Sequence, residues 1–231
     1  MSTRTLCILR NLPMFTAASA KCCDALVEAA HVQALEKGST LFLQGERASS
    51  VQFVVDGWVK LYRMAPYGGE AIIRLQSRGR SLDEVAVLKG APHGVSAETV
   101  TDSTILSIDA AAFRRIAATQ ACLSAALLQA VMDHADALTD DLEQMKVRNS
   151  VQRVALFLLA LAETHGGSAQ LRLPYEKHLI AGSLGMKPES FSRALGRLRA
   201  RGVKVQDSEV RIADLGALRD FAQSDPALSW A

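Results

Sequence analysis

Regularly spaced glycines divide the first half of the chain into short segments. Between Lys37 and Asp109 a glycine or a glycine pair recurs every 7 to 12 residues up to Gly90. The segments around these glycines are rich in β-branched and aromatic residues, and five of them read STLFLQ, VQFVVD, WVKLYRM, AIIRLQ and TILSID. Short runs of this kind with evenly spaced turn residues are typical of an antiparallel sandwich or barrel. The first half of the chain is therefore predicted to be an antiparallel β domain.

Two details refine this prediction. Asp56-Gly57 directly joins VQFVVD to WVKLYRM. An Asp-Gly pair between two such runs is the strongest short signal for a β-hairpin, so these two strands are expected to pair with each other. The alanine-rich residues 16–34, which precede the β segments, are expected to be helical.

A long helix is predicted after the β domain, because residues 110–149 contain neither proline nor glycine. Apolar side chains recur here at alternating steps of three and four residues, the a and d spacing of a coiled coil. They are Leu128, Val131, Ala135, Leu138, Leu142 and Met145. Such a narrow stripe suits a partner helix better than a broad core face, although packing on its own β domain is the alternative. We expect this helix to form a homodimer.

The remaining residues, 150–231, contain two short helical patterns and a pair of short strands. A first helix runs from about Tyr175 to Ser183, Gly185 supplies a turn, and a second helix begins near Pro188. The stretch GVKVQDSEVRIAD then predicts two strands joined at residues 207–208. This order of elements is that of a winged helix-turn-helix.

Positive charge is concentrated on the second of these helices. Residues 186–204 contain six basic side chains and one acid, a net charge of +5, whereas the whole chain carries +2. Phe191, Leu195 and Leu198 share one face and are expected to point inward. The outward side chains suit base edges in the DNA major groove, where arginine pairs with guanine and glutamate accepts from cytosine. The candidate DNA-binding residues are Lys187, Glu189, Ser190, Ser192, Arg193, Arg197 and Arg199. A solvated charged helix is the alternative, but it leaves the coincidence of turn, wing and charge unexplained.

Composition and missing motifs exclude several other classes of protein. A chain of 231 residues with 49% hydrophobic and 22% charged residues is typical of a soluble protein with two domains. Neither a run of about 18 apolar residues nor a signal-peptide pattern occurs, so we expect a cytoplasmic protein without a membrane partner. No hydrolase, metalloprotease, P-loop or dinucleotide motif is found, which argues against an enzyme. The basic helix and wing argue against an effector-binding regulatory subunit that does not bind DNA.

The four cysteines, Cys7, Cys22, Cys23 and Cys122, include no C-x-x-C pair. Adjacent cysteines cannot easily hold one metal ion tetrahedrally, so no metal site is expected. We expect ordinary thiols in a reducing compartment, with a redox or cluster role as the less favoured alternative.

These motifs resemble the Crp/Fnr family of bacterial transcription regulators along nearly the full chain. The resemblance is carried by KGSTLFLQGE (37–46), VVDGWVKLYR (54–63), GRSLDEVAVL (79–88) and PESFSRALGRL (188–198). It implies an α+β fold with an N-terminal antiparallel β-roll like a cyclic-nucleotide-binding jelly roll (1–118). A long dimerisation helix (119–149) and a C-terminal winged helix-turn-helix (150–231) would follow. It also implies an effector-controlled homodimer that binds double-stranded DNA and acts with RNA polymerase.

The most specific part of the resemblance lies in PESFSR. The Fnr-type signature E-x-x-S-R matches Glu189, Ser192 and Arg193. This match implies a TTGAT-like half-site in an inverted repeat. The surrounding segment is most similar to the denitrification-regulator branch, whose members respond to nitric oxide through haem.

The resemblance also identifies candidates for an effector pocket, namely Asp83, Glu84, Val95 and Ser96. Relatives that bind cyclic nucleotides carry a Gly-Glu pair followed by Arg-Ser. Here Asp83 replaces the glycine and Val95 replaces the phosphate-binding arginine. The loss of a charge-assisted contact and the added carboxylate should cost several kcal/mol of binding, which disfavours cyclic AMP.

The identity of the effector stays open at this point. The cysteines lack the spaced N-terminal cluster that an iron–sulfur regulator needs, so no such cluster is expected. Haem is a candidate cofactor, with His93 near the β-roll pocket and His134 on the dimer helix as candidate ligands. An isolated histidine is, however, more often a packing or surface residue. A cyclic AMP receptor and a haem-based nitric oxide sensor are therefore the alternatives.

Overall fold

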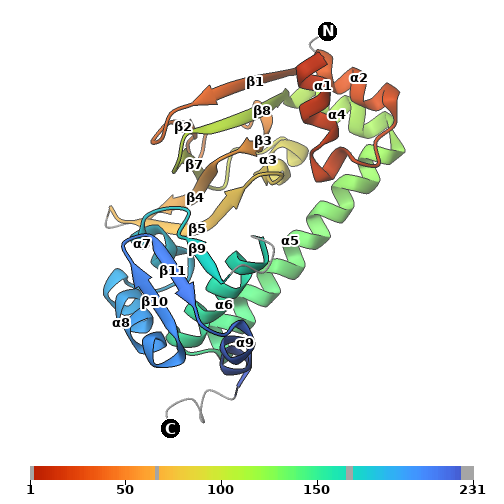
Figure 1. Ribbon diagram of the computed structural model, residues 1–231. Coiled ribbons are helices and arrows are strands. Elements are labelled where there is room, and N and C mark those ends of the chain that lie inside the picture. The colour runs from red at the N-terminus through yellow and green to blue at the C-terminus, as the bar shows by residue number, and fades with distance from the viewer. Residues whose placement is uncertain (1–2, 66–67, 165–168, 225–231) are drawn as a thin grey trace. The chain divides into compact units, whose positions relative to one another are not determined.

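A computed structural model describes residues 3–65, 68–164 and 169–224. Its internal contacts divide the chain into two compact units, Met1–Asp136 and Ala137–Ala231. Figure 1 shows the order of their helices and strands.

The first unit consists of two antiparallel four-stranded sheets and a group of helices. The sheets have the strand orders β1-β8-β3-β6 and β2-β7-β4-β5. The strands are β1 (Ala30–Leu35), β2 (Thr40–Phe42), β3 (Ser50–Asp56), β4 (Trp58–Met64), β5 (Glu70–Ser77), β6 (Ser81–Leu82), β7 (Ser96–Thr99) and β8 (Ser103–Asp109). The helices are α1 (Thr3–Arg10), the 3-10 turn η1 (Pro13–Phe15), α2 (Ala20–Glu28), α3 (Glu84–Lys89), α4 (Ala110–Thr119) and the first part of α5 (Ala121–Val147). The predicted antiparallel β domain is confirmed.

Alternation along the strands builds two cores in this unit. On β3, Val54 joins a cluster that contains residues of both sheets, whereas its neighbour Phe53 joins a cluster formed largely by helices. On β8, Ile105 belongs to the cluster between the sheets, and its neighbour Leu106 belongs to the helical cluster. Successive side chains of a strand point to opposite faces, so one sheet contacts the other sheet on one side and helices on the other.

The predicted hairpin at Asp56-Gly57 is wrong. β3 pairs with β8 and β6, whereas β4 pairs with β5 and β7, so the two strands belong to different sheets. Gly57 has φ +88°, and a Cβ atom there would lie 2.6 Å from the backbone oxygen of Asp102. The glycine therefore serves a close crossover between sheets. The Asp-Gly dipeptide did not reveal this crossover, because the residues of a turn do not specify which strands will pair with the two strands that it joins.

The helix predicted for residues 16–34 is correct only in part. α2 begins after Ser19, whose hydroxyl oxygen accepts from the backbone N–H of Cys22, and it ends at Glu28. Residues 30–35 form strand β1, paired in register with β8. Tertiary pairing overrides the helical preference of this alanine-containing segment.

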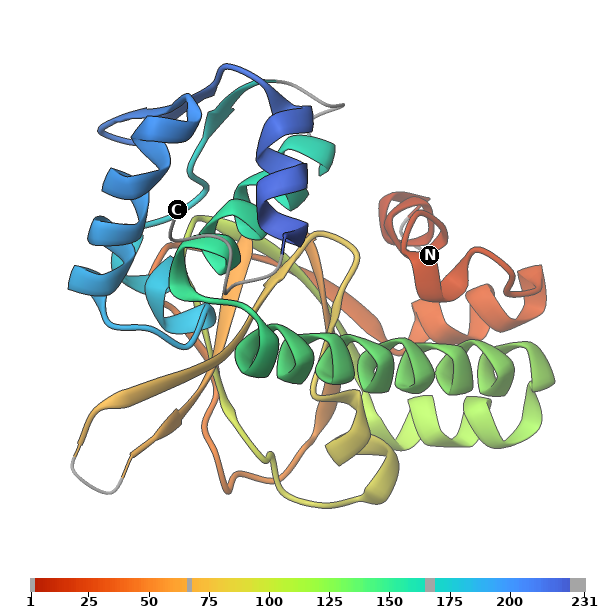
Figure 2. The same ribbon diagram turned by 90° about the horizontal axis from the view of Figure 1, so that it is seen from below.

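The helical stretch that begins at Ala110 consists of two helices. α4 and α5 are separated at Gln120 and meet at an angle of 109°. α5 then runs without interruption to Val147, as Figure 2 shows. No single helix of the described segments is long and apolar enough to cross a membrane. The bent α4–α5 pair passes such a test by length and composition alone.

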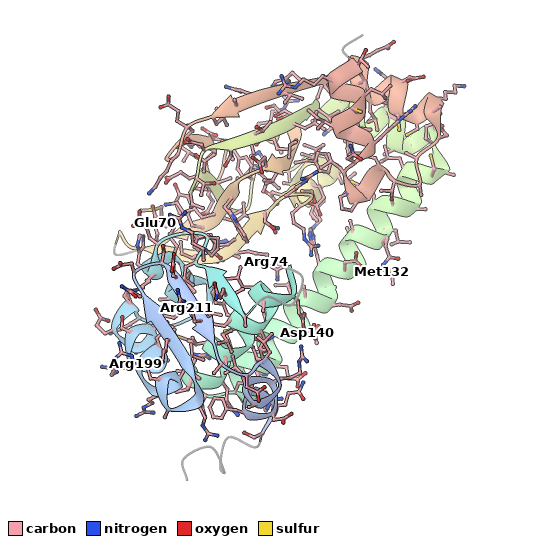
Figure 3. All side chains as sticks on the ribbon, in the orientation of Figure 1. Glu70, Arg74, Met132, Asp140, Arg199 and Arg211 are labelled. Atoms are coloured by element: carbon pink, nitrogen blue, oxygen red, sulfur yellow. The ribbon has the colours of Figure 1, made fainter. Side chains whose placement is uncertain are left out.

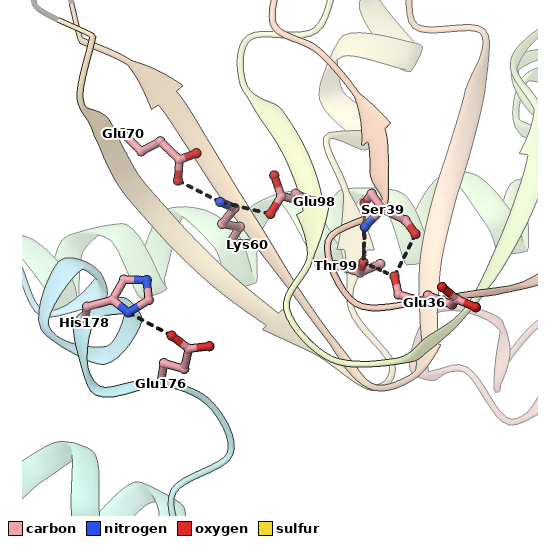
Figure 4. A network of polar contacts seen from close by, with 8 residues as sticks. All are labelled: Glu36, Ser39, Lys60, Glu70, Glu98, Thr99, Glu176 and His178. Atoms are coloured by element: carbon pink, nitrogen blue, oxygen red, sulfur yellow. Dashed lines mark hydrogen bonds and ion pairs between the residues drawn. The ribbon is translucent and has the colours of Figure 1, made fainter.

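A buried lysine forms ion pairs on the sheet that contains β4, β5 and β7. The Nζ of Lys60 lies 2.7 Å from Glu70 and 3.2 Å from Glu98 (Figure 4). Burial lowers the pKa of Lys60, but the hydrogen bonds and charges of both carboxylates outweigh that effect and raise it. The partners thus satisfy a charge that would be costly to bury alone.

The second unit has the arrangement predicted for a winged helix-turn-helix. It contains the last part of α5, α6 (Ser150–Thr164), α7 (Lys177–Ser183), α8 (Pro188–Leu198), the 3-10 turn η2 (Arg199–Arg201) and α9 (Leu215–Gln223). Its sheet has the order β10-β11-β9, formed by Val203–Gln206, Glu209–Ile212 and Gln170–Arg172. The predicted helices, the turn at Gly185 and the two wing strands are confirmed.

Candidate nucleic-acid interface and effector pocket

A tight turn ends α7 and sets the start of α8. Gly185 has φ +63°, a left-handed conformation that glycine adopts without strain. Its N–H donates to the carbonyl oxygen of Gly182, and the N–H of Met186 donates to that of Ala181, both at 3.0 Å. These two bonds form a Schellman motif, which closes a helix end. Pro188 then occupies the first turn of α8, where its missing N–H is harmless.

One face of α8 is held in the core of the second unit. Phe191, Ala194, Leu195 and Leu198 are buried and share a cluster with side chains of α6. Their spacing of three and four residues defines a single face. The inward face predicted from the sequence is confirmed, and the opposite face is left outward.

The outward face carries the polar residues expected to contact DNA. Glu189, Ser192, Arg193 and Arg197 are exposed, and Ser190 is partly exposed. The Nη2 of Arg193 donates to the Oγ of Ser190 at 3.1 Å. Glu189 and Arg193 lie four positions apart and therefore one helical turn apart on this face. The structure thus brings the residues of the E-x-x-S-R signature together on one exposed surface.

Cationic side chains flank this face. Lys187 is the exposed residue that precedes the first turn of α8. Arg199 is also exposed but lies beyond the last residue of α8, in η2 (Figure 3). On the wing, Lys204 of β10 and Arg211 of β11 are directly opposite each other and both exposed. Like charges facing each other across strands are unfavourable unless an anion lies nearby. The wing pair was not among the predicted site residues, although the alternation in VKVQ and EVRI places both outward.

In the effector-pocket region, the carboxylate of Asp83 contacts two neighbouring residues of a nearby loop, His93 and Gly94. Asp83 adopts a left-handed conformation with φ +49°, which suits the glycine that the family pattern has there. Its Oδ2 lies 2.9 Å from the Nδ1 of His93 and accepts from the N–H of Gly94 at 3.2 Å. The ring of His93 is buried and stacks on Phe42, with 3.7 Å between ring centroids.

Glu84 pairs with the long helix instead of facing the same loop. Its side chain is 1% exposed, and its Oε1 lies 2.9 Å from the Nδ1 of His134 on α5. Burial raises the pKa of the Glu84 carboxyl, but His134, with smaller contributions from a backbone donor and Ser81, lowers it more. The net pKa lies below the usual value, so the carboxylate is ionised although it is buried.

The two remaining pocket candidates lie next to the Asp83 loop. Ser96 is buried, and its Oγ accepts from the backbone N–H of Gln44 at 2.9 Å. Val95 is partly buried against the apolar cluster between the sheets. A guanidinium does reach this loop from β4, where the Nε–H of Arg63 donates to the carbonyl oxygen of Gly94 at 2.9 Å. The sequence pattern did not identify Arg63, because its position lies far from the cassette in the chain.

A cavity of about 440 Å³ lies elsewhere in the first unit. It is bounded by α5 residues from Cys122 to His134, by the segment around Pro13 and by residues 79–81. The four pocket candidates are not among its lining residues. By helical geometry its α5 face lies opposite the stripe that includes Leu128 and Leu138. We call this space the α5 cavity.

The α5 cavity allows a test of the two candidate haem ligands. His134 lines the cavity, and a carboxylate on its other ring nitrogen is the usual companion of a metal-bound histidine. His93 lies outside the cavity and is enclosed by Phe42 and Asp83. Of the two histidines, only His134 lines the cavity, so it is the one that would hold a haem there, and the haem would supply an iron for gas binding. Within residues 3–65, 68–164 and 169–224, no group of three or more His, Cys, Asp or Glu side chains could hold a metal ion.

Two known domain families match the chain. The Cyclic nucleotide-binding domain family matches residues 32–120, and the Crp-like helix-turn-helix domain family matches residues 152–221. The first match covers the two sheets, and the second covers α7, the turn, α8 and the wing.

Individual relatives agree with both matches. The chain is 28% identical to the transcriptional activator protein FnrA of Stutzerimonas stutzeri, over 78% of this chain and 75% of that protein. It is 26% identical to the CRP-like cAMP-activated global transcriptional regulator of Mycobacterium tuberculosis, over 77% of this chain and 82% of that protein. A crystal structure of a candidate cyclic nucleotide binding protein from Ruegeria pomeroyi is 39% identical, with a TM-score of 0.68 over 97% of this chain and all of that one. With its exposed basic helix on a winged helix-turn-helix, the chain belongs to the Crp/Fnr family of DNA-binding transcription regulators.

Proposed function

We propose that this regulator is an effector-controlled homodimer that reads an inverted-repeat, TTGAT-like site through α8. The exposed cluster of Glu189, Ser192 and Arg193 carries this proposal. The three side chains lie on the face that the buried Phe191 and Leu195 direct away from the core. An arginine can pair with guanine O6 and N7, and a glutamate can accept from cytosine N4, so this face can distinguish base pairs.

The other basic side chains position the protein on the DNA backbone. Lys187 precedes α8, Arg197 lies on its last turn and Arg199 follows it. Cations at the edges of a reading face neutralise phosphates without distinguishing sequence. Ser190, which accepts from Arg193, orients the arginine that reads the base. As a transcription regulator acting on chromosomal DNA, the protein would also meet RNA polymerase in the cytoplasm.

Two arginine substitutions test this division of roles. Arg193→Ala should cost about 1–3 kcal/mol on the preferred duplex and relax discrimination at one base pair, because a bidentate base contact is lost. Arg199→Ala should weaken preferred and scrambled duplexes alike and lower the salt slope by about one unit, because one phosphate contact is lost. The measurement is fluorescence anisotropy with both duplexes at two salt concentrations. Equal, uniform losses for the two variants would contradict the assignment of reader and anchor.

Dimerisation through α5 follows from an apolar stripe that the single chain leaves exposed. Leu128, Leu138, Leu142 and Met145 are each at least half exposed, and Val131 is 38% exposed. Ala135 continues the stripe and is exposed as well. A continuous row of large exposed apolar side chains marks an interaction site, and the a and d spacing suits a second copy of the same helix. A two-fold symmetric dimer would present two α8 helices to two half-sites, about 34–36 Å apart.

The proposed effector is not cyclic AMP, although a relative is named for that ligand. The Asp83 carboxylate, held by His93 and Gly94, would lie near an anionic ligand. Glu84, which would have to bind a ribose hydroxyl, is engaged with His134. Val95 supplies no charge to a phosphate. Each of these features opposes an anionic nucleotide.

Restoring the cassette tests this part of the proposal. The double variant Asp83→Gly with Val95→Arg should bind cyclic AMP roughly 100-fold more tightly than the parent, because it gains a charge-assisted contact and loses a repulsion. Glycine also suits the left-handed backbone at this position. The measurement is isothermal calorimetry, and Asp83→Gly with Val95→Leu is the control that adds no charge. Tight binding of cyclic AMP by the unmodified protein would contradict the proposal.

A further inference from the structure

A reciprocal cap joins the end of α5 to the start of α6. The Oδ1 of Asn149 accepts from the backbone N–H groups of Val151 and Gln152, both at 3.0 Å. In return, the Oε1 of Gln152 accepts from the backbone N–H of Asn149 at 3.2 Å. This pattern is a capping box, which fixes the first turn of a helix. It uses only the oxygen of the Gln152 side chain and leaves its amide nitrogen for another partner.

That nitrogen contacts the C-terminal end of α9. Gln152 is fully buried, and its Nε2 donates to the carbonyl oxygens of Ser224 at 2.8 Å and Phe221 at 3.3 Å. The Nη1 of Arg148, the residue directly after α5, donates to the same Ser224 oxygen at 3.2 Å. Carbonyl groups at the end of a helix lack helical partners, so side-chain donors from another element can bind them. The end of α9 is therefore bonded to both sides of the α5–α6 junction.

The same helix contacts the chain just beyond α8. The guanidinium carbon of Arg201, in η2, lies 4.6 Å from the centroid of the Phe221 ring, which is a cation–π geometry. Phe221 also belongs to the buried cluster that contains Phe191 and Leu198 of α8. The ring of Phe221 thus contacts the end of the reading helix, while its carbonyl group is bound at the α5–α6 junction.

A second contact links α5 to the turn that precedes α8. A Cβ atom on Gly185 would lie 3.5 Å from the Sδ of Met145, so the last turn of α5 lies against this turn. Met145 is also the last residue of the exposed apolar stripe on α5. Both segments that flank α8 are therefore connected to the end of α5, one directly through Met145 and the other through α9.

We propose, given the homodimer and the inverted repeat of the proposed function, that α9 fixes the orientation of α8 relative to α5 and thereby selects the spacing of the two half-sites. Arg148 and Gln152 are the positioning residues, because they hold the end of α9. In a two-fold dimer each α8 enters one major groove, and one added base pair turns the second half-site by about 34–36° around the duplex axis. A rigid connection tolerates one spacing, whereas a loose connection tolerates several.

The test measures fluorescence anisotropy of the full-length protein on inverted repeats and on a single half-site. The repeats have the preferred spacer or a spacer one base pair longer or shorter, and the parent should prefer the first by roughly tenfold or more. Gln152→Leu should reduce this preference to less than about threefold, because both donated bonds to α9 are lost. Arg148→Ala removes one bond and should reduce it by about twofold. Half-site affinity should stay within about twofold of the parent, because the reading face of α8 is unchanged.

Arg219→Ala is the matched control. The Nη2 of Arg219 on α9 lies 3.1 Å from the Oε1 of Glu163 on α6, but this pair is exposed and lies at the other end of α6 from the junction. This variant should keep the spacer preference of the parent.

Arg148 is only partly buried, so Arg148→Ala decides the matter even if Gln152→Leu does not fold. An Arg148→Ala protein that kept the full spacer preference, or that lost half-site and inverted-repeat binding equally, would overturn the positioning role alone. A parent protein without any spacer preference would contradict the homodimeric site as well, so the two failures are distinguishable.

Discussion

Leu138→Asp should convert the protein from a dimer to a monomer. Leu138 occupies the middle of the exposed α5 stripe and is 54% exposed in the single chain. In a two-fold coiled coil, one substitution would bury two carboxylates near each other. Burying an unpaired charge costs several kcal/mol, and a like charge beside it adds repulsion, so dimer affinity should fall by more than roughly 100-fold. The measurement is light scattering across a range of protein concentrations.

Asp140→Lys is the matched control for this substitution. Asp140 lies on the same helix, is exposed and points away from it (Figure 3). By helical geometry it lies on the face opposite the stripe, so a charge reversal there should leave the dimer intact. A Leu138→Asp protein that stayed dimeric at micromolar concentration would show that α5 is not the main interface. The variant should also lose tight binding to an inverted repeat, while a single half-site is affected less.

His134→Ala should destabilise the first unit by about 3 kcal/mol at neutral pH. The substitution leaves the buried Glu84 carboxylate without the imidazole that lies 2.9 Å from its Oε1, and leaving a buried charge without its partner has costs of this size. Urea unfolding followed by the fluorescence of Trp58, in a chain that also carries Trp230→Phe, would report on this unit. Adding Glu84→Gln to His134→Ala should recover much of the loss, because the uncompensated charge is removed.

A second histidine–carboxylate pair provides the control. The Nδ1 of His178 lies 3.3 Å from the Oε2 of Glu176 (Figure 4), and both side chains are more than half exposed. Exposed pairs contribute at most about 1 kcal/mol, so His178→Ala should have little effect. Equal effects of His134→Ala and His178→Ala would contradict the importance of the partner of the buried Glu84.

The stability that Glu84 contributes depends on pH in a definite direction. Its pKa is lower in the folded chain than the usual value of 4.5. The contribution is therefore present above pH 4.5 and is lost as the pH falls through the lower folded pKa. The difference in unfolding free energy between the parent and His134→Ala should accordingly shrink in that acidic range. A difference that grew on acidification would contradict this account.

The winged helix-turn-helix could be predicted from the sequence because its determinants are local. Gly185 supplies the left-handed turn, Pro188 the first turn of α8, and the period of Phe191, Leu195 and Leu198 the buried face. Each acts within a few residues of its own position. The α5 stripe was readable for the same reason, since a helical period shows which side chains share a face. The strand runs of the β domain were likewise marked by local composition and glycine spacing.

Only the tertiary structure decided which strands pair with each other and which distant side chains are in contact. A hairpin-like dipeptide joins β3 to β4, yet the two strands lie in different sheets. β3 pairs with β8 and β4 pairs with β7, and both of these partner strands come later in the chain. Glu84 and His134 are 50 positions apart, so no local pattern links them. Periodicity specifies the direction of a side chain relative to its own element, whereas its neighbours across the core depend on how all elements pack. The sequence by itself therefore determined the family and the exposed basic helix α8, and packing alone decided that Glu84 lies against His134 in the first unit.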